Sequence, residues 1–279
     1  MSNRIQITNP GFDNADQERC AGNEVQIDIG NDISRQRSRN EDEPVISDHI
    51  VKGNLYQALF VEFLGTSIYV FIATIPYYDS SAPGMALIAL IACFGKISGG
   101  HFNPAVTIGV SLCGRLSLQA TILYPVVQIV GGLLGAALTR AVQPPRAYID
   151  NEYFFENGIT VLRKDVKPGW ALLCEGLITF FLVLTYLMCT LEKQKTNWVL
   201  SSLAIGFIAQ ANIIAADFIT RASMNPARSF GPAVCTSVFT KNVWKHHYVY
   251  WVGPMAGSAI AAFAWRCIHC QWSCCFRPK

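Results

Sequence analysis

The chain has 279 residues and a formal net charge of +3; 51% of its residues are hydrophobic and only 15% are charged. Soluble proteins carry roughly 25% charged residues, so this composition excludes an ordinary water-soluble domain. The charges gather in residues 1–54, which hold ten acidic and six basic side chains, and the remaining body is sparsely charged. Neither part has the strongly basic balance of a nucleic-acid-binding protein. We therefore expect a membrane protein without a nucleic-acid partner.

The first predicted region is residues 1–54, which are rich in Asn, Asp, Gln, Arg and Ser. Such a segment cannot bury enough apolar surface to offset the entropy of ordering it, which predicts a disordered cytosolic tail. No apolar stretch follows Met1, and this argues against a cleavable signal peptide.

The body contains apolar segments of two lengths. A helix needs about 20 apolar residues to cross the hydrocarbon core, and six segments meet or approach this length: 55–76, 84–98, 118–142, 169–191, 198–216 and 247–267. Two further segments, 104–114 and 226–238, are too short to span, and each starts at an Asn-Pro-Ala triplet. Basic residues near the ends of the spans, such as Lys52 and Arg266, favour placing both termini in the cytosol.

The two halves of the body resemble each other. Residues 59–66 and 172–179 are similar, and each segment contains a glutamate, Glu62 or Glu175. From each Asn-Pro-Ala asparagine, Asn103 or Asn225, a Gly-x-x-x-Gly motif begins 28 residues on. Small residues at this spacing let membrane helices approach closely.

Each repeat contains three spans, an odd number, so the copies must enter the membrane in opposite directions. We therefore predict an all-α channel domain, 55–268, made of repeat one (55–142), a loop (143–168) and repeat two (169–268), with a Cys-rich cytosolic tail at 269–279. The two short segments would be re-entrant half-helices that meet at the membrane midplane. The stretches before them, 95–102 and 217–224, are expected to be non-helical. Non-helical backbone at that depth must line a water-filled path, which predicts a pore.

Two motifs carry a resemblance to a known family: Ile-Ser-Gly-Gly-His-Phe-Asn-Pro-Ala-Val at 97–106 and Ser-Met-Asn-Pro-Ala-Arg-Ser-Phe-Gly-Pro-Ala at 223–233. With them, residues 55–268 resemble the aquaporin (major intrinsic protein) family. The resemblance implies a homotetramer with one pore per subunit, which passes water or small neutral solutes and needs no cofactor or metal. Residues 128–138 and 247–254 look most like the aquaporin-eight branch, which is associated with water, ammonia and hydrogen peroxide.

The two asparagines are the first candidate site residues. Asn103 and Asn225 would each point an amide donor into the pore, beside two helix N-termini that add a positive field of roughly half an elementary charge each. A water molecule that accepts from both amides turns its hydrogens outward, and this opposes the passage of protons and cations. The alternative is that both asparagines are only helix caps in a packed core.

Other roles follow from the resemblance. Arg228 would lie at the outer constriction, with a buried structural ion pair as the alternative. Glu62 and Glu175 would brace the loops by accepting backbone N–H bonds. An acceptor ladder would come from the backbone carbonyls of the two loops, which belong to Gly99, Gly100, His101, Arg221, Ala222 and Ser223.

The expected selectivity filter departs from the strict water type. Ile213 stands where orthodox water channels have His, and Ala222 stands where some members have a mercury-sensitive Cys. The position expected to hold Phe or His falls on Pro83, so either the second span has another register or the filter lacks an aromatic wall. A more apolar opening predicts permeability to ammonia or peroxide as well as water.

The ten cysteines do not predict a disulfide framework, because most lie in spans or on the expected cytosolic side. Four of them, Cys267, Cys270, Cys274 and Cys275, follow the last span closely and are candidates for palmitoylation; unmodified thiols or a zinc site with His269 are the alternatives.

The chain lacks the residue patterns of an enzyme. Two interpretations compete with a water channel: a coupled transporter, and a junctional or solute-specialised family member with low water flux. The host membrane is expected to be the plasma membrane or an intracellular membrane.

Overall fold

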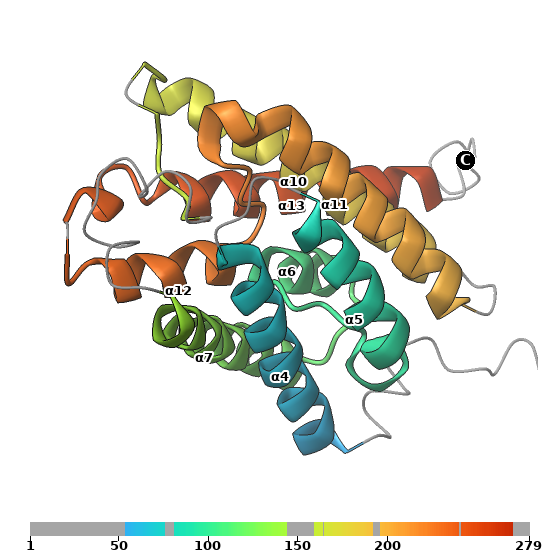
Figure 1. Cartoon of the computed structure of the whole chain (residues 1–279). Helices are drawn as coiled ribbons and strands as arrows, with labels where there is room; N and C mark the ends of the chain where they lie inside the picture. The colour runs from blue at the N-terminus through green and yellow to red at the C-terminus, as the bar shows by residue number, and fades with distance from the viewer. Residues whose placement is uncertain are drawn as a thin grey trace, which may run out of the picture. The chain divides into compact units, whose positions relative to one another are not determined.

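The computed structural model describes residues 54–75, 81–143, 159–163, 165–191, 196–239 and 241–269, which all belong to one compact unit, residues 44–279. The described residues form eight α-helices and one short 3-10 helix, with no strand among them (Figure 1). The expected tail, as far as residue 53, and Cys270, Cys274 and Cys275 lie outside the described residues. Most of the expected loop 143–168 also lies outside them.

The helices follow the same order in both halves. The first half contains α4 (Leu55–Thr74), α5 (Ala82–Ser98), α6 (Pro104–Leu112) and α7 (Leu118–Val142). The second half contains α10 (Pro168–Thr190), α11 (Trp198–Thr220), α12 (Pro226–Thr236) and α13 (Val249–His269), with the 3-10 helix η1 (Lys241–Trp244) before α13. Each half thus has three long helices and one short helix, which comes third.

Glycines set the packing of the long helices within each half. On α7, Gly131 faces the Phe63 carbonyl and Gly135 faces the Ser67 carbonyl, both on α4. On α13, Gly257 lies against the backbone of Gly176 on α10 in the same manner. The space for a side chain at these glycines is taken by the partner's backbone, so each Gly-x-x-x-Gly motif forms the closest part of a helix pair.

The short helices pack against the opposite half. α6 contacts α13 and α10, whereas α12 contacts α7 and α4. The second long helices, α5 and α11, pack against each other across the two halves. Both half-length helices therefore pack against long helices of the other repeat, and α6 also packs against α7 of its own repeat.

Apolar length supports part of the expected membrane topology. Four helices, α4, α7, α10 and α11, are long and apolar enough to cross a membrane. At 17 residues α5 is shorter, and α13, although it has 21 residues, is not among the four. The all-α class is confirmed, whereas membrane crossing by α5 and α13 remains a prediction.

The non-helical stretches are shorter than the sequence predicts. We expected them at 95–102 and 217–224, but α5 continues to Ser98 and α11 continues to Thr220. An ion pair one helical turn apart, between Asp217 and Arg221 with N···O 3.1 Å, supports the last turn of α11. A residue in the left-handed region, Gly99 or Arg221, then ends each helix.

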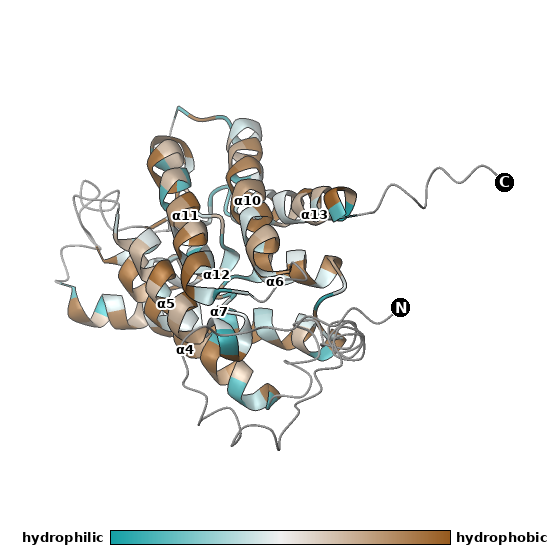
Figure 2. Ribbon diagram, turned by 90° about the vertical axis from the view of Figure 1, so that its right-hand side faces the viewer, coloured by the Kyte–Doolittle hydropathy of each residue, from teal (hydrophilic) through white to brown (hydrophobic). Residues whose placement is uncertain are grey.

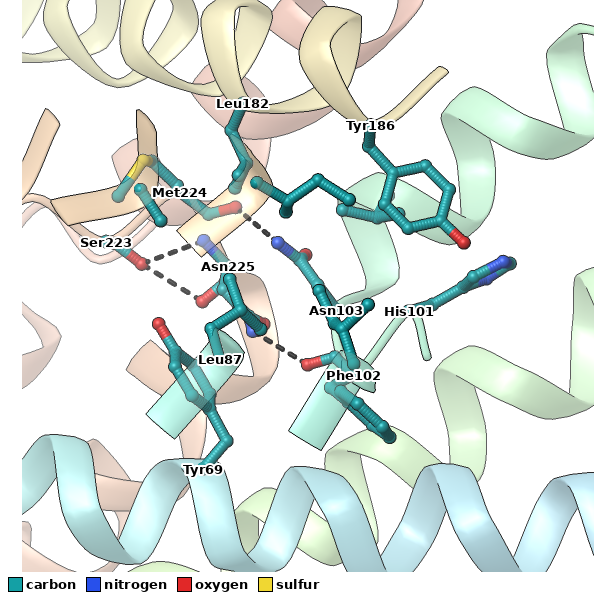
Figure 3. Close-up of a pocket in the computed structure, with 14 residues that line it drawn as sticks. Tyr69, Leu87, His101, Phe102, Asn103, Leu182, Tyr186, Ser223, Met224 and Asn225 are labelled. Atoms are coloured by element: carbon teal, nitrogen blue, oxygen red, sulfur yellow. Dashed lines mark hydrogen bonds between the residues drawn. The ribbon is translucent and has the colours of Figure 1, made fainter. Parts of the chain in front are cut away.

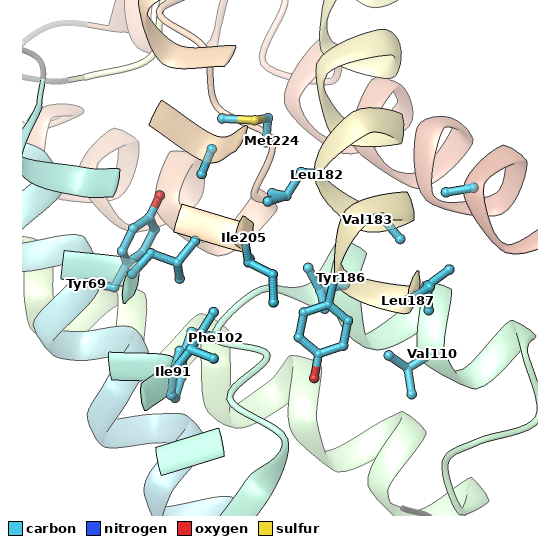
Figure 4. Close-up of a cluster of buried hydrophobic side chains, with 14 of the residues drawn as sticks. Tyr69, Ile91, Phe102, Val110, Leu182, Val183, Tyr186, Leu187, Ile205 and Met224 are labelled. Atoms are coloured by element: carbon cyan, nitrogen blue, oxygen red, sulfur yellow. The ribbon is translucent and has the colours of Figure 1, made fainter. Parts of the chain in front are cut away.

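The core consists of apolar side chains from both halves. Val70, Ile91, Val183, Leu187 and Ile205 are almost completely buried in a single cluster (Figure 4). Large apolar side chains are also exposed, among them Phe207 and Phe218 of α11 and Val126 of α7. Figure 2 shows hydrophobic residues along α10 and α11. A helix that is apolar on both faces is typical of a membrane environment.

Candidate functional site

The asparagines of the two Asn-Pro-Ala triplets cap the two short helices. The side-chain oxygen of Asn103 accepts from Ala105 N at 2.8 Å, and that of Asn225 accepts from Ala227 N at 3.0 Å. A proline follows each asparagine as the first helical residue, where its missing N–H costs no hydrogen bond. The local sequence therefore builds two helix N-termini in the same way.

The two caps are joined to each other's loops. Asn103 Nδ2 donates to the Met224 carbonyl at 2.8 Å, and Asn225 Nδ2 donates to the Phe102 carbonyl at 2.9 Å (Figure 3). The N-terminal ends of α6 and α12 consequently face each other in the interior. One N–H of each amide is thus used across the halves, and the expectation that each asparagine also points a donor into a pore remains a prediction. An amide group has two such hydrogens, so each asparagine keeps a second donor.

The two loops have matching backbone conformations. Positive φ angles occur at three places in each loop: 94°, 65° and 48° at Gly99, Gly100 and Phe102, and 63°, 41° and 54° at Arg221, Ala222 and Met224. The members of each pair are 122 positions apart, as are Asn103 and Asn225. The loops thus repeat residue by residue, although the second adopts the left-handed conformation without glycine.

Glu62 is buried beneath the first loop and accepts four hydrogen bonds. Its Oε1 accepts from His101 N at 2.9 Å and Ser98 Oγ at 2.6 Å, and its Oε2 accepts from Phe102 N at 2.7 Å and Gln128 Nε2 at 2.8 Å. A carboxylate offers about four acceptor positions, and these donors fill them. The side chain therefore ties the loop to α4 and α7.

Glu175 has the matching place beneath the second loop. It accepts from Ser223 N at 2.9 Å, Met224 N at 2.8 Å and Thr220 Oγ1 at 2.5 Å. The position that corresponds to Gln128, 25 residues after the asparagine, holds Tyr250, whose hydroxyl donates to the Thr220 carbonyl at 3.0 Å. Both glutamates are completely buried.

A ring of aromatic side chains surrounds the first loop. His101 lies edge-on between Tyr124 and Tyr186, with ring centroids 5.4 and 5.5 Å away, and its Nδ1 lies 3.0 Å from Thr107 Oγ1. The Tyr186 hydroxyl donates to the Gly99 carbonyl at 2.6 Å. One acceptor position of that carbonyl, which we assigned to the expected ladder, is thus already occupied.

A narrow cavity adjoins the asparagine pair. The space open to the centre of a water molecule is about 20 Å³, and roughly 10–15 Å³ suffices for one water. Apolar side chains make most of its wall, and the polar side chains include those of Asn103, Asn225, His101 and Ser223 (Figure 3). The cavity has the size and the lining to hold one or two water molecules.

Most of the lining residues were not identified from the sequence, and two of them could have been. Tyr69 on α4 and Leu182 on α10 both line the cavity. Tyr69 follows Glu62 by seven residues, and Leu182 follows Glu175 by seven. Residues seven apart lie on one face of a helix, so the helical spacing from each glutamate could have indicated both.

The four residues expected to form the filter are buried outside this cavity. Arg228 lies in the first turn of α12; its Nη2 donates to the Ala73 carbonyl at 3.4 Å, and its Nη1 has no hydrogen-bond partner among the described residues. Ile213 and Ala222 belong to the apolar cluster of the core. Pro83 lies in the first turn of α5. None of the four lines the cavity at the asparagine pair.

The described residues hold no group of three or more His, Cys, Asp or Glu side chains that could bind a metal ion. The six described cysteines, Cys267 among them, are free thiols. The polar groups of the site are thus amides, hydroxyls, one imidazole and backbone groups, which bind neutral polar molecules by hydrogen bonds.

Comparison with known proteins agrees with this geometry. Residues 49–265 match the family model described as Major intrinsic protein. The chain is 34% identical over 232 residues to aquaporin-4 of Mus musculus, covering 77% of this chain and 68% of that protein. It is 36% identical over 211 residues to aquaporin-8 of Notomys alexis, covering 71% and 77%.

A solved structure shares the fold. The aquaglyceroporin from Plasmodium falciparum superimposes with a TM-score of 0.68 at 21% sequence identity, over 80% of this chain and 100% of that chain. With the family model matched over most of the sequence, and with the paired Asn-Pro-Ala helices of the interior, the chain belongs to the major intrinsic protein family of multi-pass membrane proteins, the aquaporins.

Proposed function

We propose that the chain is a passive channel for water that also admits small neutral solutes such as ammonia or hydrogen peroxide. The observation that carries this proposal is the pair of asparagines, which meet across the two halves beside a cavity of about 20 Å³. Six spans and two re-entrant half-helices, with both termini in the cytosol, complete the arrangement. A homotetramer with one pore per subunit is the assembly that we infer.

The second amide hydrogen of Asn103 and of Asn225 would donate to the oxygen of a passing water molecule. The N-terminal ends of α6 and α12 add positive potential at the same place. A water oxygen held in this way directs both hydrogens away from the centre, so the chain of donors and acceptors is interrupted there. Protons and cations are excluded while water passes.

The loops and the outer residues have distinct roles in this proposal. Glu62 and Glu175 hold the loops so that carbonyls of Gly99–His101 and Arg221–Ser223 face the path. Arg228 would repel cations at the outer constriction, with Ile213, Ala222 and Pro83 as its other walls. Because none of those three supplies a polar side chain, the constriction favours solutes that shed bound water readily.

Stopped-flow light scattering tests the proposal. Proteoliposomes that contain the full chain are exposed to an osmotic step and compared with empty liposomes. Faster shrinkage with a low activation energy would support an open water pore, whereas shrinkage equal to that of empty liposomes would contradict it. The experiment is repeated without residues 1–50 to detect a tail that closes the pore.

The solute range needs a separate comparison. Ammonia and hydrogen peroxide uptake is measured in the same vesicles, for the wild-type chain and for Ile213→His, which restores a polar donor at the constriction. We expect the variant to retain water flux and to lose solute flux. Solute flux in wild-type vesicles equal to that in empty liposomes would overturn this part of the proposal.

A second candidate is a solute-specialised or junctional member with low water flux. The narrow cavity, together with the use of one N–H of each asparagine across the halves, favours it over a coupled transporter. Slow osmotic shrinkage with rapid peroxide entry would select the solute channel. Absence of both fluxes would select the junctional role.

A further inference from the structure

Two arginines, Arg115 and Arg266, lie at the corner between the end of α6 and the end of α13. The Arg115 guanidinium lies over the Trp265 ring, 5.8 Å from its centre. Gly114 precedes Arg115 in the chain. Arg266 Nη2 lies 3.9 Å from the position that a Cβ on Gly114 would occupy. We call this region, residues 113–115 with Trp265 and Arg266, the α6–α13 corner.

No described carboxylate neutralises these charges. The described residues contain four carboxylate side chains, and each is engaged elsewhere: Glu62 and Glu175 beneath the loops, Asp165 near Arg163, and Asp217 with Arg221. The His269 ring stacks on the Trp265 ring, with centroids 4.4 Å apart. Two arginines close to each other repel, and no carboxylate of the described residues offsets this repulsion, so the corner favours an anion.

The surroundings of the corner indicate which anion binds. Large apolar side chains are exposed next to it: Leu112 and Leu118 on the α6 side, and Phe263 and Ile268 on α13. Figure 2 shows this mixture of hydrophobic and hydrophilic residues at the last turns of α13. Positive charge beside an exposed apolar face matches a molecule that has both an anionic group and hydrocarbon chains.

We propose that Arg115 and Arg266 together bind the phosphate of an anionic phospholipid at the α6–α13 corner. The acyl chains would lie along the exposed apolar residues of α13, while the guanidiniums hold the phosphate by charge-assisted hydrogen bonds. Trp265 orients Arg115 through its ring. This inference rests on the membrane placement proposed above, but it does not depend on what passes through the pore.

Native mass spectrometry of the full-length protein in detergent tests the proposal. The protein is mixed with equal amounts of phosphatidic acid and phosphatidylcholine that carry the same acyl chains, and the bound lipids are counted. We expect phosphatidic acid to be preferred. In the Arg115→Gln/Arg266→Gln variant the preference should fall about fivefold for each guanidinium removed.

A matched control separates the corner from general charge. Lys167→Gln/Lys245→Gln removes two exposed positive charges from other described positions and should leave the preference unchanged. An equal loss in both double variants, or no loss in the arginine variant, would overturn the proposal. Displacement of the lipid by inorganic phosphate, but not by chloride at equal ionic strength, would show a free-anion site and would also overturn it.

Osmotic water flux is measured on the same preparations. Unchanged flux in the arginine variant shows that it folds, and a lost lipid preference then belongs to the corner alone. If the wild-type chain has no flux, the proposed function fails while the lipid measurement still stands; a circular-dichroism melting curve then verifies folding.

Discussion

Asn103 and Asn225 each donate a hydrogen bond to the backbone carbonyl of the residue that precedes the other, at N···O distances of 2.8 and 2.9 Å. Each side chain therefore does two things: its oxygen caps its own helix and its nitrogen holds the opposite loop. These bonds join the two repeats at the midplane of the proposed pore. They also fix where the remaining amide hydrogens point.

We predict that Asn103→Asp destabilises the protein although it keeps the helix cap. Aspartate caps a helix as well as asparagine does, but it has no N–H to donate and it places a charge against the Met224 carbonyl. Loss of a buried hydrogen bond with an unpaired group left behind costs about 1–3 kcal/mol. Thermal unfolding in detergent measures the effect.

Asn197→Asp is the matched control for this prediction. Asn197 is exposed and caps α11 by accepting a hydrogen bond from Leu200 N at 3.2 Å. Its replacement by aspartate introduces the same negative charge. We expect its unfolding midpoint to remain near that of the wild-type protein. Equal midpoints for the two variants would show that the bond between the halves contributes nothing to stability.

We predict that Glu62→Gln weakens the first loop strongly. A glutamine has one acceptor oxygen, and its NH₂ group would face the N–H or O–H groups that now donate to the carboxylate. At least one of the backbone donors, His101 N or Phe102 N, would lose its partner, at a cost of about 1–3 kcal/mol each. Both the unfolding midpoint and the osmotic water flux should fall.

Asp165→Asn serves as the comparison for this change, because the Asp165 side chain is 81% exposed. Substitution at such a position has little effect on stability. A Glu62→Gln protein as stable and as permeable as Asp165→Asn would contradict the role of Glu62 as a support of the loop.

Much of the architecture could be predicted from the sequence, because apolar length and repeated offsets depend on local composition. The glycine spacing predicts a close helix pair in each half, and Gly131, Gly135 and Gly257 lie at such contacts. The bond from Asn103 to Met224 could not be predicted. It depends on the distance between two loops that are 121 residues apart in the chain, and sequence spacing within each half does not determine that distance.

The ends of the loops were also difficult to predict. A glycine pair marks the turn at Gly99, but nothing in the residue types at Arg221 and Ala222 indicates left-handed backbone. Only the alignment of the two repeats on Asn103 and Asn225 would transfer the conformation from the first loop to the second. The filter positions are difficult to predict for a similar reason. Pro83 can be assigned to the filter only by counting residues back from Asn103 along α5.

We predict opposite effects for two Gly→Ala changes in one helix contact. A Cβ on Gly257 would collide with the Gly176 carbonyl group, which belongs to rigid backbone, whereas a Cβ on Gly176 would lie 3.6 Å from the Gly253 oxygen, an ordinary contact. Gly257→Ala should therefore separate α13 from α10 and cost about 1–3 kcal/mol. Gly176→Ala should be neutral, or gain up to about 1 kcal/mol from helix propensity.

Unfolding of both variants in a denaturing detergent series measures the difference. Because both glycines lie in the same contact between α10 and α13, any general effect of a methyl group there would appear in both proteins. Similar midpoints for Gly257→Ala and Gly176→Ala would contradict the close approach of the two helices.

The matching loops allow one further prediction, in which a glycine in the first loop is replaced by alanine and the matching alanine in the second loop is replaced by glycine. Gly100 has φ of 65° and Ala222, its counterpart, has φ of 41°. A residue with a Cβ in this region costs about 1–2 kcal/mol compared with glycine. Gly100→Ala should therefore lower the unfolding midpoint, and Ala222→Gly should raise it or leave it unchanged.

The space around Gly100 helps to isolate the backbone effect. A Cβ there would lie 3.4 Å from Gly95 Cα and 3.5 Å from Ile91 Cα, which are near-ordinary contacts, so crowding alone would account for little destabilisation. The gain at Ala222 is limited by the extra freedom that glycine gives the unfolded chain. If Ala222→Gly lowers the midpoint as far as Gly100→Ala does, the two loops do not share the left-handed conformation, and the residue-by-residue repeat of the site would be wrong.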